Sequence, residues 1–376
     1  MPGVQCISFT PQLDNEAVML MEIDPSLLDY LMVGDSLVVR GEKSDQAVLC
    51  TKDQTYDIRE AETSNTLLMM PEFDFPSELE SHSEPVILHR TVQAMKHEYY
   101  ELRKTKPRLK RLRELLQENV YSGWECEGEE EHQGKKYTYE ELSETIQASE
   151  VELLQGLHDL PACLIDGYWR MLDFEFCSKV LESLLALKDS ESWDFDEIPA
   201  KACCDLLADI YPKNVIQHVL ECYGEKKERE KTQASDADDE NVLYKIKEDN
   251  VCRYYAELLL RPVEKFNLQE FENVWQLAVP DSFKTSLYQL EGLALVDRDS
   301  TPQIIRYYPH TDLPDDASDR FNALFQTKER WSLDEITPYI KDLVTEKLKV
   351  GTLLNKYARS STQNGIKVYN SRKPVA

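Results

Sequence analysis

The residues best suited to chemistry are nine cysteines and seven histidines, and their spacing matches no common reactive site. No two cysteines form a C-x-x-C pair, the histidines lack metal-ligand spacing, and neither a P-loop nor a dinucleotide fingerprint occurs. Cys203 and Cys204 lie inside the apolar helical run "AKACCDLLADI", so we expect them in a core. The many carboxylates form no recognisable acid–base pair. The sequence therefore predicts a protein that is not an enzyme and needs no cofactor or metal ion.

Length, charge and cysteine content limit the class of protein further. The chain has 376 residues, which is too long for one ordinary core and indicates two or more domains. Its net charge of −27 disfavours general coating of nucleic acid, because phosphate binding needs a positive field, so any DNA contact must come from a local patch. The odd number of cysteines, with no signal peptide or apolar run of about 18 residues, indicates reduced thiols in a cytosolic or nuclear protein.

The first 95 residues are predicted to be rich in β-strands. Short runs of strand-forming residues alternate with turn residues such as Asp14-Asn15 and Gly34-Asp35: "VQCISF", "AVMLMEI", "SLVVRG", "AVLC" and "PVILHRTV". This part carries 17 acidic and 5 basic residues. Strands of this length and spacing predict a small barrel or sandwich.

Two of these runs are apolar on both sides. "AVMLM" (17–21) and "LLMM" (67–70) have no polar face, so each must be covered twice. Each Leu or Met left in water would forgo roughly 1.5–3 kcal/mol. Two interpretations stay open at this point: the local barrel closes on itself, or strands from another chain complete it.

A basic run and two acidic segments follow. "RKTKPRLKRLR" (103–113) has seven basic residues, and its leucines recur at helical spacing, which predicts a helix over 101–118 with charges on its outer face. A nuclear-import signal or an anionic contact are the alternatives. The acidic segments 125–136 and 225–240 are predicted loops.

The rest of the chain repeats one local pattern at four places: "YTYEEL" (137–142), "WDFDEI" (193–198), "FNLQEF" (266–271) and "WSLDEI" (331–336). The second residue of each can cap a helix, and the glutamate three residues later can bond back to the cap, which makes a capping box. The leading aromatic can pack on the apolar residue five positions on as a hydrophobic staple. The repetition predicts four helix starts.

The starts at 137, 266 and 331 are each followed by a turn, a second helix and a β-hairpin, and another helix precedes each of them (101–118, 249–261 and 315–327). This order predicts winged helices. The copy at 193 is less regular, because the acidic loop 225–240 stands where a wing is expected. The predicted class is α+β, with a β-barrel-like domain, either closed by itself or completed by partner chains, followed by tandem winged helices. The predicted domains are 1–98, 99–172, 173–248, 249–312 and 313–376.

The last copy is the predicted DNA-binding one. Residues 341–376 hold eight basic residues against Asp342 and Glu346, and Asn364-Gly365 is expected to form the wing's turn. A solvated positive face that balances an acidic partner is the alternative. The predicted DNA-binding residues are Lys347, Lys349, Lys356, Arg359, Lys367, Arg372 and Lys373.

The stretch "CTKDQTYDIREAETSNTLLMM" (50–70), followed by repeated winged helices and a basic end, resembles the family of defective-in-sister-chromatid-cohesion (DCC) proteins along the whole chain. The resemblance implies a nuclear, non-catalytic adaptor in an alternative replication factor C clamp loader, which acts on the sliding clamp (PCNA) at replication forks and supports cohesion. ATP hydrolysis would belong to other subunits. The partner-binding residues that it implies are Tyr56, Ile58, Leu67, Leu68, Met69 and Met70.

The same resemblance implies the partners. The first domain would share β-barrels with two chromosome-transmission-fidelity subunits, one small and one the large clamp-loader subunit. The winged helices would contact DNA polymerase epsilon and single- or double-stranded DNA without strong sequence preference. No contact with a membrane is expected. Two other functions are kept as alternatives: a stand-alone winged-helix DNA-binding regulator, and a cullin-like ubiquitin-ligase scaffold.

Overall fold

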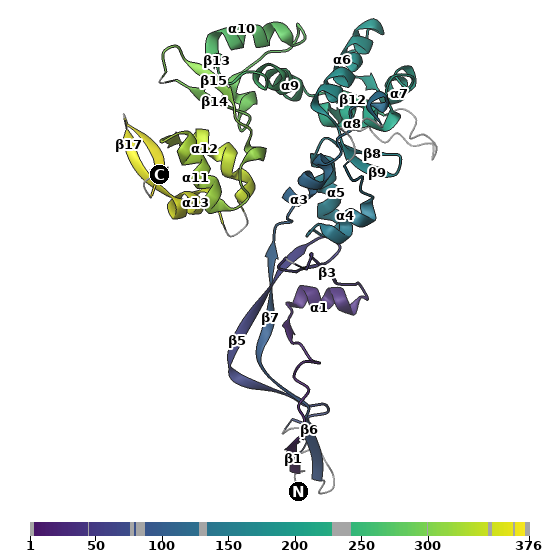
Figure 1. The fold of residues 1–376 in the computed structure, drawn as a ribbon, viewed down its shortest axis with the longest axis vertical. Helices are drawn as coiled ribbons and strands as arrows, with labels where there is room; N and C mark the ends of the chain where they lie inside the picture. The colour runs from purple at the N-terminus through teal and green to yellow at the C-terminus, as the bar shows by residue number, and fades with distance from the viewer. Residues whose placement is uncertain are drawn as a thin grey trace. The chain divides into compact units, whose positions relative to one another are not determined.

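The computed structural model describes residues 4–43, 45–75, 79, 87–127, 134–227, 242–298, 300–344, 348–363 and 365–372. Helices and strands both contribute, so the α+β class is confirmed. The chain divides into an N-terminal unit, residues 1–173, and a C-terminal unit, residues 174–376. We describe each unit by itself, with the element labels of Figure 1.

The N-terminal unit begins with two open sheets. A five-stranded sheet has the order β2-β7-β5-β4-β3, and a separate parallel pair joins β1 to β6. Free edges remain in both, so the described strands do not close into a barrel by themselves. The strands are β1 (Val4–Phe9), β2 (Met21–Glu22), β3 (Val38–Arg40), β4 (Val48–Cys50), β5 (Thr55–Met69), β6 (Ile87–Val92) and β7 (Ala94–Thr105).

Strands β5 and β7 form a long antiparallel ribbon (Figure 1). Their pairing runs from Thr55↔Thr105 to Met69↔Ala94 and is interrupted by a bulge between Glu62 and Leu67. The prediction of a helix over 101–118 is therefore wrong for its first residues, because the backbone of 101–105 is paired in the ribbon. Pro107 also disfavours helical backbone in the residue before it. The helix starts only at Lys110.

One short helix, α1 (Pro25–Met32), covers part of the five-stranded sheet. Asp24 caps it by accepting a hydrogen bond from the Leu27 backbone N–H, and Pro25 takes the first helical position. Leu27 packs with Leu49 and Tyr56 in a small core. The sequence analysis missed this helix and expected strand over 17–23, where only Met21–Glu22 is paired.

A first helical set completes the N-terminal unit. Its elements are α3 (Lys110–Gln117), α4 (Tyr139–Thr145), α5 (Glu150–Asp159) and the hairpin of β8 (Ala162–Ile165) with β9 (Tyr168–Met171). Leu112, Leu116, Leu142 and Leu153 are fully buried in one core. The apolar stripe of the basic run is thus inward as predicted.

The C-terminal unit contains three further sets in the same order of helices and strands, each with a three-stranded sheet. The first has α6 (Phe174–Ser190), β10 (Ile198–Pro199), α7 (Ala200–Leu206), α8 (Lys213–Tyr223), β11 (Gly224–Lys226) and β12 (Leu243–Ile246). The second has α9 (Glu248–Leu260), β13 (Phe266–Asn267), α10 (Leu268–Ala278), a 3-10 helix (Leu287–Leu290), β14 (Ala294–Asp297) and β15 (Ile304–Tyr307). The third has α11 (Ala317–Thr327), β16 (Trp331–Ser332), α12 (Leu333–Ile340), α13 (Val350–Tyr357), β17 (Ala358–Gln363) and β18 (Ile366–Ser371).

Three of the four predicted helix starts are confirmed. Thr138 and Ser332 form complete capping boxes with Glu141 and Glu335. Asn267 caps α10 by accepting from the Glu270 N–H. The staple is also formed at this start, where the rings of Phe266 and Phe271 meet edge to face with their centroids 5.8 Å apart.

The fourth predicted helix start, at Asp194, is wrong. Helix α7 begins at Ala200 after Pro199, with no side-chain cap, so Asp194 and Glu197 lie outside the helix. Ile198-Pro199 instead pair with β12. The acidic segment also differs from the expectation, because β11 and β12 flank it and pair with each other. Residues 228–241 between these strands are outside the described residues.

We predict that Ser332→Ala lowers the stability of α12 by about 1 kcal/mol, because the N–H of Glu335 loses its cap. Amide hydrogen exchange over 333–340 should speed up about fivefold. Asp194→Ala is the matched control and should leave exchange over 200–206 unchanged. Equal effects of the two substitutions would contradict the assignment of the caps.

Candidate protein-binding surface

The strands of the N-terminal unit leave most of their length unpaired on one side. Strand β4 pairs with β5 only at Thr55–Asp57, and β2 pairs with β7 only at Tyr100 and Glu101. Beyond these short contacts the β5–β7 ribbon is two-stranded, and β1–β6 is a two-stranded parallel pair. Such pairs are marginally stable in water, and open edges favour pairing with another chain. The geometry therefore suits strand addition.

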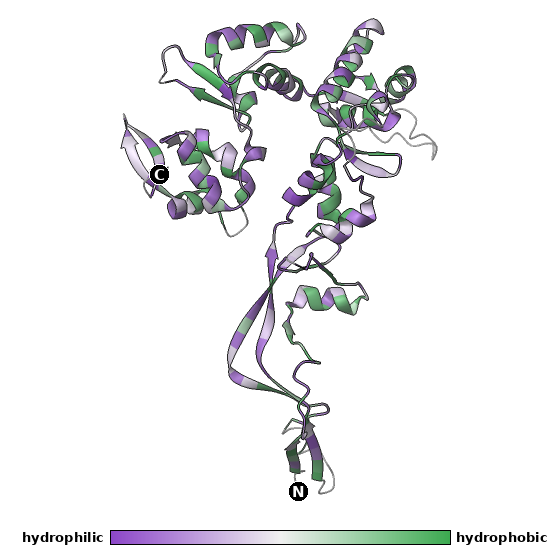
Figure 2. Cartoon of the chain, in the orientation of Figure 1, coloured by the Kyte–Doolittle hydropathy of each residue, from purple (hydrophilic) through white to green (hydrophobic). Residues whose placement is uncertain are grey.

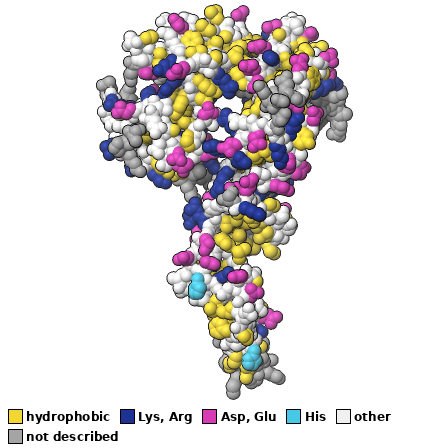
Figure 3. Space-filling model, viewed as in Figure 1, with side chains coloured by type: hydrophobic (Ala, Val, Ile, Leu, Met, Phe, Trp, Pro, Cys, Tyr) yellow, Lys and Arg dark blue, Asp and Glu magenta, His cyan; other side chains and the backbone are white. Residues whose placement is uncertain are grey.

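The same part of the chain exposes many large apolar side chains. Among the described residues, 16 of the 28 exposed large apolar side chains lie between residues 4 and 87. We call them the open apolar surface; they are Val4, Ile7, Phe9, Met19, Met21, Leu28, Leu31, Met32, Val33, Val38, Val39, Leu67, Leu68, Phe73, Phe75 and Ile87. Figure 2 shows hydrophobic colour on β1, β6 and α1, and Figure 3 shows apolar side chains meeting solvent around α1.

Little of this surface is covered from within. The core under α1 has three buried members, Leu27, Leu49 and Tyr56. In contrast, the third set of the C-terminal unit buries a continuous core that includes Trp331, Ile336 and Leu353. Exposed large apolar side chains that gather in one part of a folded protein mark an interaction site. The open apolar surface is thus the best candidate for a functional site on this chain.

The six residues predicted to bind partners fall into two groups. Tyr56 is 5% exposed and Ile58 packs beside it, so both belong to the internal core. Leu67 and Leu68 are 36% and 42% exposed, and Met69 and Met70 are half-buried. The sequence analysis missed the apolar outer side of α1; the run "SLLDYLMV", apolar on every helical face, was the available signal.

The middle of the ribbon is acidic. Glu62 lies opposite Glu98, and Glu60 is close to the same carboxylate. A hydrogen bond to Glu98, together with repulsion from it, raises the pKa of Glu60. Like charges placed across two strands disfavour the pairing. A partner with basic side chains at this level would relieve that repulsion.

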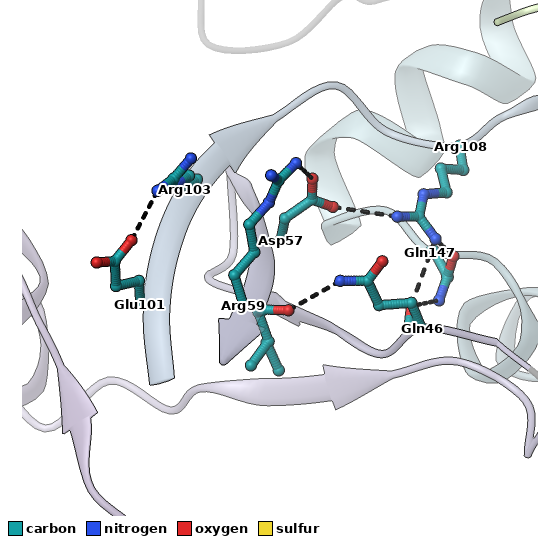
Figure 4. Close-up of polar contacts among 8 residues, drawn as sticks. Gln46, Asp57, Arg59, Glu101, Arg103, Arg108 and Gln147 are labelled. Atoms are coloured by element: carbon teal, nitrogen blue, oxygen red, sulfur yellow. Dashed lines mark hydrogen bonds and ion pairs between the residues drawn. The ribbon is translucent and has the colours of Figure 1, made fainter. Parts of the chain in front are cut away.

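Polar contacts fix the sheet to the first helical set (Figure 4). The Arg108 guanidinium donates to Asp57 Oδ1 at 3.1 Å and to Gln147 Oε1 at 2.5 Å, and the Gln147 amide donates to the Gln46 carbonyl at 2.7 Å. Buried Thr55 donates to Glu152 Oε2 at 2.5 Å. These bonds join strand residues to α5 and to the segment before it, so a partner that binds the sheet also holds this helical set.

The predicted DNA-binding residues lie on the third set of the C-terminal unit. Lys349, Lys356, Arg359, Lys367 and Arg372 are exposed. The Arg372 guanidinium is occupied, because it donates to the carbonyls of Ala358 and Asn355 and so ties β18 to the end of α13. Gly365 has a φ of 80°, which suits the predicted turn. Lys347, Asn364 and Lys373 lie outside the described residues.

The cysteines are all free thiols. Burial raises the pKa of Cys203 to about 12 and the pKa of Cys222 and Cys252 to about 11, so these thiols stay protonated at neutral pH. Cys203 is buried in α7 as predicted, and Cys204 is half-buried. In the described part of the chain, no group of three or more His, Cys, Asp or Glu side chains is arranged to hold a metal ion. No helix in the same residues is long and apolar enough to cross a membrane.

Comparison with known proteins identifies the class. The family model "Sister chromatid cohesion protein Dcc1" matches residues 18–340. The chain is 45% identical to the mouse protein "Sister chromatid cohesion protein DCC1" over all of its own length and 93% of that relative. The human protein of the same name is 44% identical over 100% of this chain and 94% of the human protein. The Saccharomyces cerevisiae protein is 24% identical over 94% of this chain and 96% of the yeast protein.

The chain therefore belongs to the Dcc1 family of sister chromatid cohesion proteins. The resemblance found in the sequence is confirmed, and it extends along almost the full length of these relatives. Their names describe a role in cohesion and no catalytic activity.

We predict that Leu67→Gln with Leu68→Gln reduces binding of a hydrophobic dye to the chain but changes the free energy of unfolding by less than about 0.5 kcal/mol, because both side chains are already partly exposed to water. Leu49→Ala, at a buried position, should cost about 2–5 kcal/mol. Dye fluorescence and urea unfolding are the measurements. A large loss of stability in the double variant would show that these leucines are covered by the chain itself.

Proposed function

We propose that the chain is a non-catalytic adaptor subunit of an alternative replication factor C clamp loader that acts on PCNA at replication forks in the nucleus. In this proposal it supports sister chromatid cohesion by linking the loader to DNA and to DNA polymerase epsilon. The observation that carries the proposal is the open apolar surface on sheets with unpaired edges. An adaptor that is completed by its neighbours needs such a surface, whereas a stand-alone regulator does not.

The proposed partners of this surface are the two chromosome-transmission-fidelity subunits, the large clamp-loader subunit and its small companion. Their strands would pair with the free edges of the ribbon and complete the barrel. Main-chain hydrogen bonds would supply affinity, and the exposed apolar side chains would be buried at about 25 cal/mol per Å². Family membership supports this assignment, since the relatives share the whole length of the chain.

The four helical sets are proposed to be winged helices. The order of helices with a final hairpin and the three-stranded sheets of the C-terminal unit support this. The third set of that unit is the proposed DNA contact: among the described residues, no carboxylate lies within ion-pair distance of Lys349, Lys356 or Lys367. Contacts to phosphates through such lysines would bind single- or double-stranded DNA with little preference for sequence.

We predict that the full chain, co-expressed with both chromosome-transmission-fidelity subunits, elutes from gel filtration as a complex. Phe9→Ser with Ile87→Ser should abolish it, because both side chains belong to the open apolar surface. Leu277→Ser is the matched control: this leucine is 86% exposed on α10, outside that surface, and the complex should persist. A wild-type chain that stays alone as a stable monomer would remove the adaptor role.

We predict that replacing Lys349, Lys356 and Lys367 by Ala weakens DNA binding and reduces the salt slope by about 2–3, since each lost phosphate contact removes about 0.9. Lys213, Lys226 and Lys245 are the control set, because each is paired with a carboxylate. Titration of labelled duplex at several salt concentrations measures both. Unchanged affinity would remove the DNA role, and a sequence preference that survives competitor DNA would favour a stand-alone regulator.

A further inference from the structure

Arg40 is a buried charge for which no described residue supplies an ion-pair partner. It is the last residue of β3 and is 8% exposed. Its Nε and Nη1 atoms are buried and have no hydrogen-bond partner. Burying a guanidinium is strongly unfavourable unless a carboxylate and further hydrogen bonds compensate it. The chain has 70 acidic residues, yet none of the described ones pairs with this guanidinium.

A carboxylate of the chain that approaches this part of the sheet is already used. Arg40 lies opposite Val48 across the β3–β4 pair, so its side chain is on the same face as Cys50 and Thr55. Glu152 approaches this face from α5, but its Oε2 atom accepts from the Thr55 hydroxyl at 2.5 Å and from the Ser149 N–H at 3.0 Å. This carboxylate caps α5 and is not within ion-pair distance of Arg40.

The other side of β3 is open. This strand is the outermost of the five-stranded sheet, so nothing in the described part of the chain pairs beyond it. Its neighbours Val38 and Val39 are 42% and 61% exposed and belong to the open apolar surface. A strand added here would bring its side chains to about 4.5–5.5 Å from those of β3. A residue facing Arg40 would then be within reach of the guanidinium.

We infer that β3 is the edge to which a partner subunit adds a strand, and that a Glu or Asp of that strand pairs with Arg40 while apolar residues beside it cover Val38 and Val39. This inference rests on the proposed adaptor function and specifies the chemistry of one contact in it. A planar guanidinium that can form two parallel bonds to a carboxylate discriminates this partner residue from an amide or a hydroxyl.

The test compares Arg40→Met with wild type in complexes with the two chromosome-transmission-fidelity subunits. The melting temperature of the free Arg40→Met chain should stay the same or rise, because an unpaired charge is removed. Its dissociation constant for the partner subunits should increase at least tenfold. Arg111→Met is the matched control, since Arg111 is half-exposed on α3 and pairs with Glu114 at 3.4 Å; its complex should form normally.

A second readout needs no substitution. Amides of Val38–Arg40 in the wild-type chain should become protected from hydrogen exchange when the partner subunits bind. Equal affinity of Arg40→Met and wild type, a loss of folding in the free variant, or unprotected amides in the complex would each overturn the inference and leave the adaptor role standing. Failure of the wild-type chain to bind either subunit would instead overturn the adaptor role, and this inference with it.

Discussion

An unpaired strand edge favours pairing with another strand, and exposed apolar side chains favour cover. Within the described part of the first hundred residues, neither the strand edges nor the apolar side chains are fully covered. The β5–β7 ribbon extends well beyond the short strands that flank it, and β1 and β6 form a pair too small to be stable alone. The buried cluster under α1 has three members among the described residues, Leu27, Leu49 and Tyr56. The N-terminal strands therefore have the form expected for one part of a larger sheet.

The helical sets, unlike the N-terminal sheets, bury much of their apolar surface within the chain. Continuous cores are buried around Leu142 and Leu153 in the first set and around Trp331 and Ile336 in the last set, where Leu295 of β14 joins the core. The polar joint of Arg108, Asp57 and Gln147 attaches the first helical set to the incomplete sheet. A subunit built in this way can be held by partners through its sheet and still present folded helical surfaces.

How far the sequence predicts this structure depends on whether local or distant contacts decide each element. Capping at Thr138, Asn267 and Ser332 is local, and there the predicted starts hold. At Asp194 the same pattern fails, because the following Ile198-Pro199 pair with a strand more than forty residues away, Leu243–Ile246. Residues 101–105 were predicted as helix and are strand for the same reason, because they pair with Thr55–Arg59 of β5, more than forty residues away.

The candidate site was predictable only in part. The apolar run Leu67–Met70 indicated a surface that needs cover. Nothing in the sequence, however, distinguished Tyr56, which is buried, from Leu68, which is exposed. The exposure of the outer side of α1 and the lack of a partner for Arg40 among the described residues follow from the three-dimensional arrangement of the sheet, in which β3 lies at an edge. No spacing in the sequence encodes this arrangement.

The most direct test of the central claim is hydrogen exchange measured by mass spectrometry across Ile58–Met69 of β5, in the free chain and in the complex with its proposed partner subunits. Exchange in the free chain should be fast beyond the short β4 pairing and should slow at least tenfold in the complex. Full protection of this ribbon in the free chain would contradict the account, because the strands would then need no foreign neighbour.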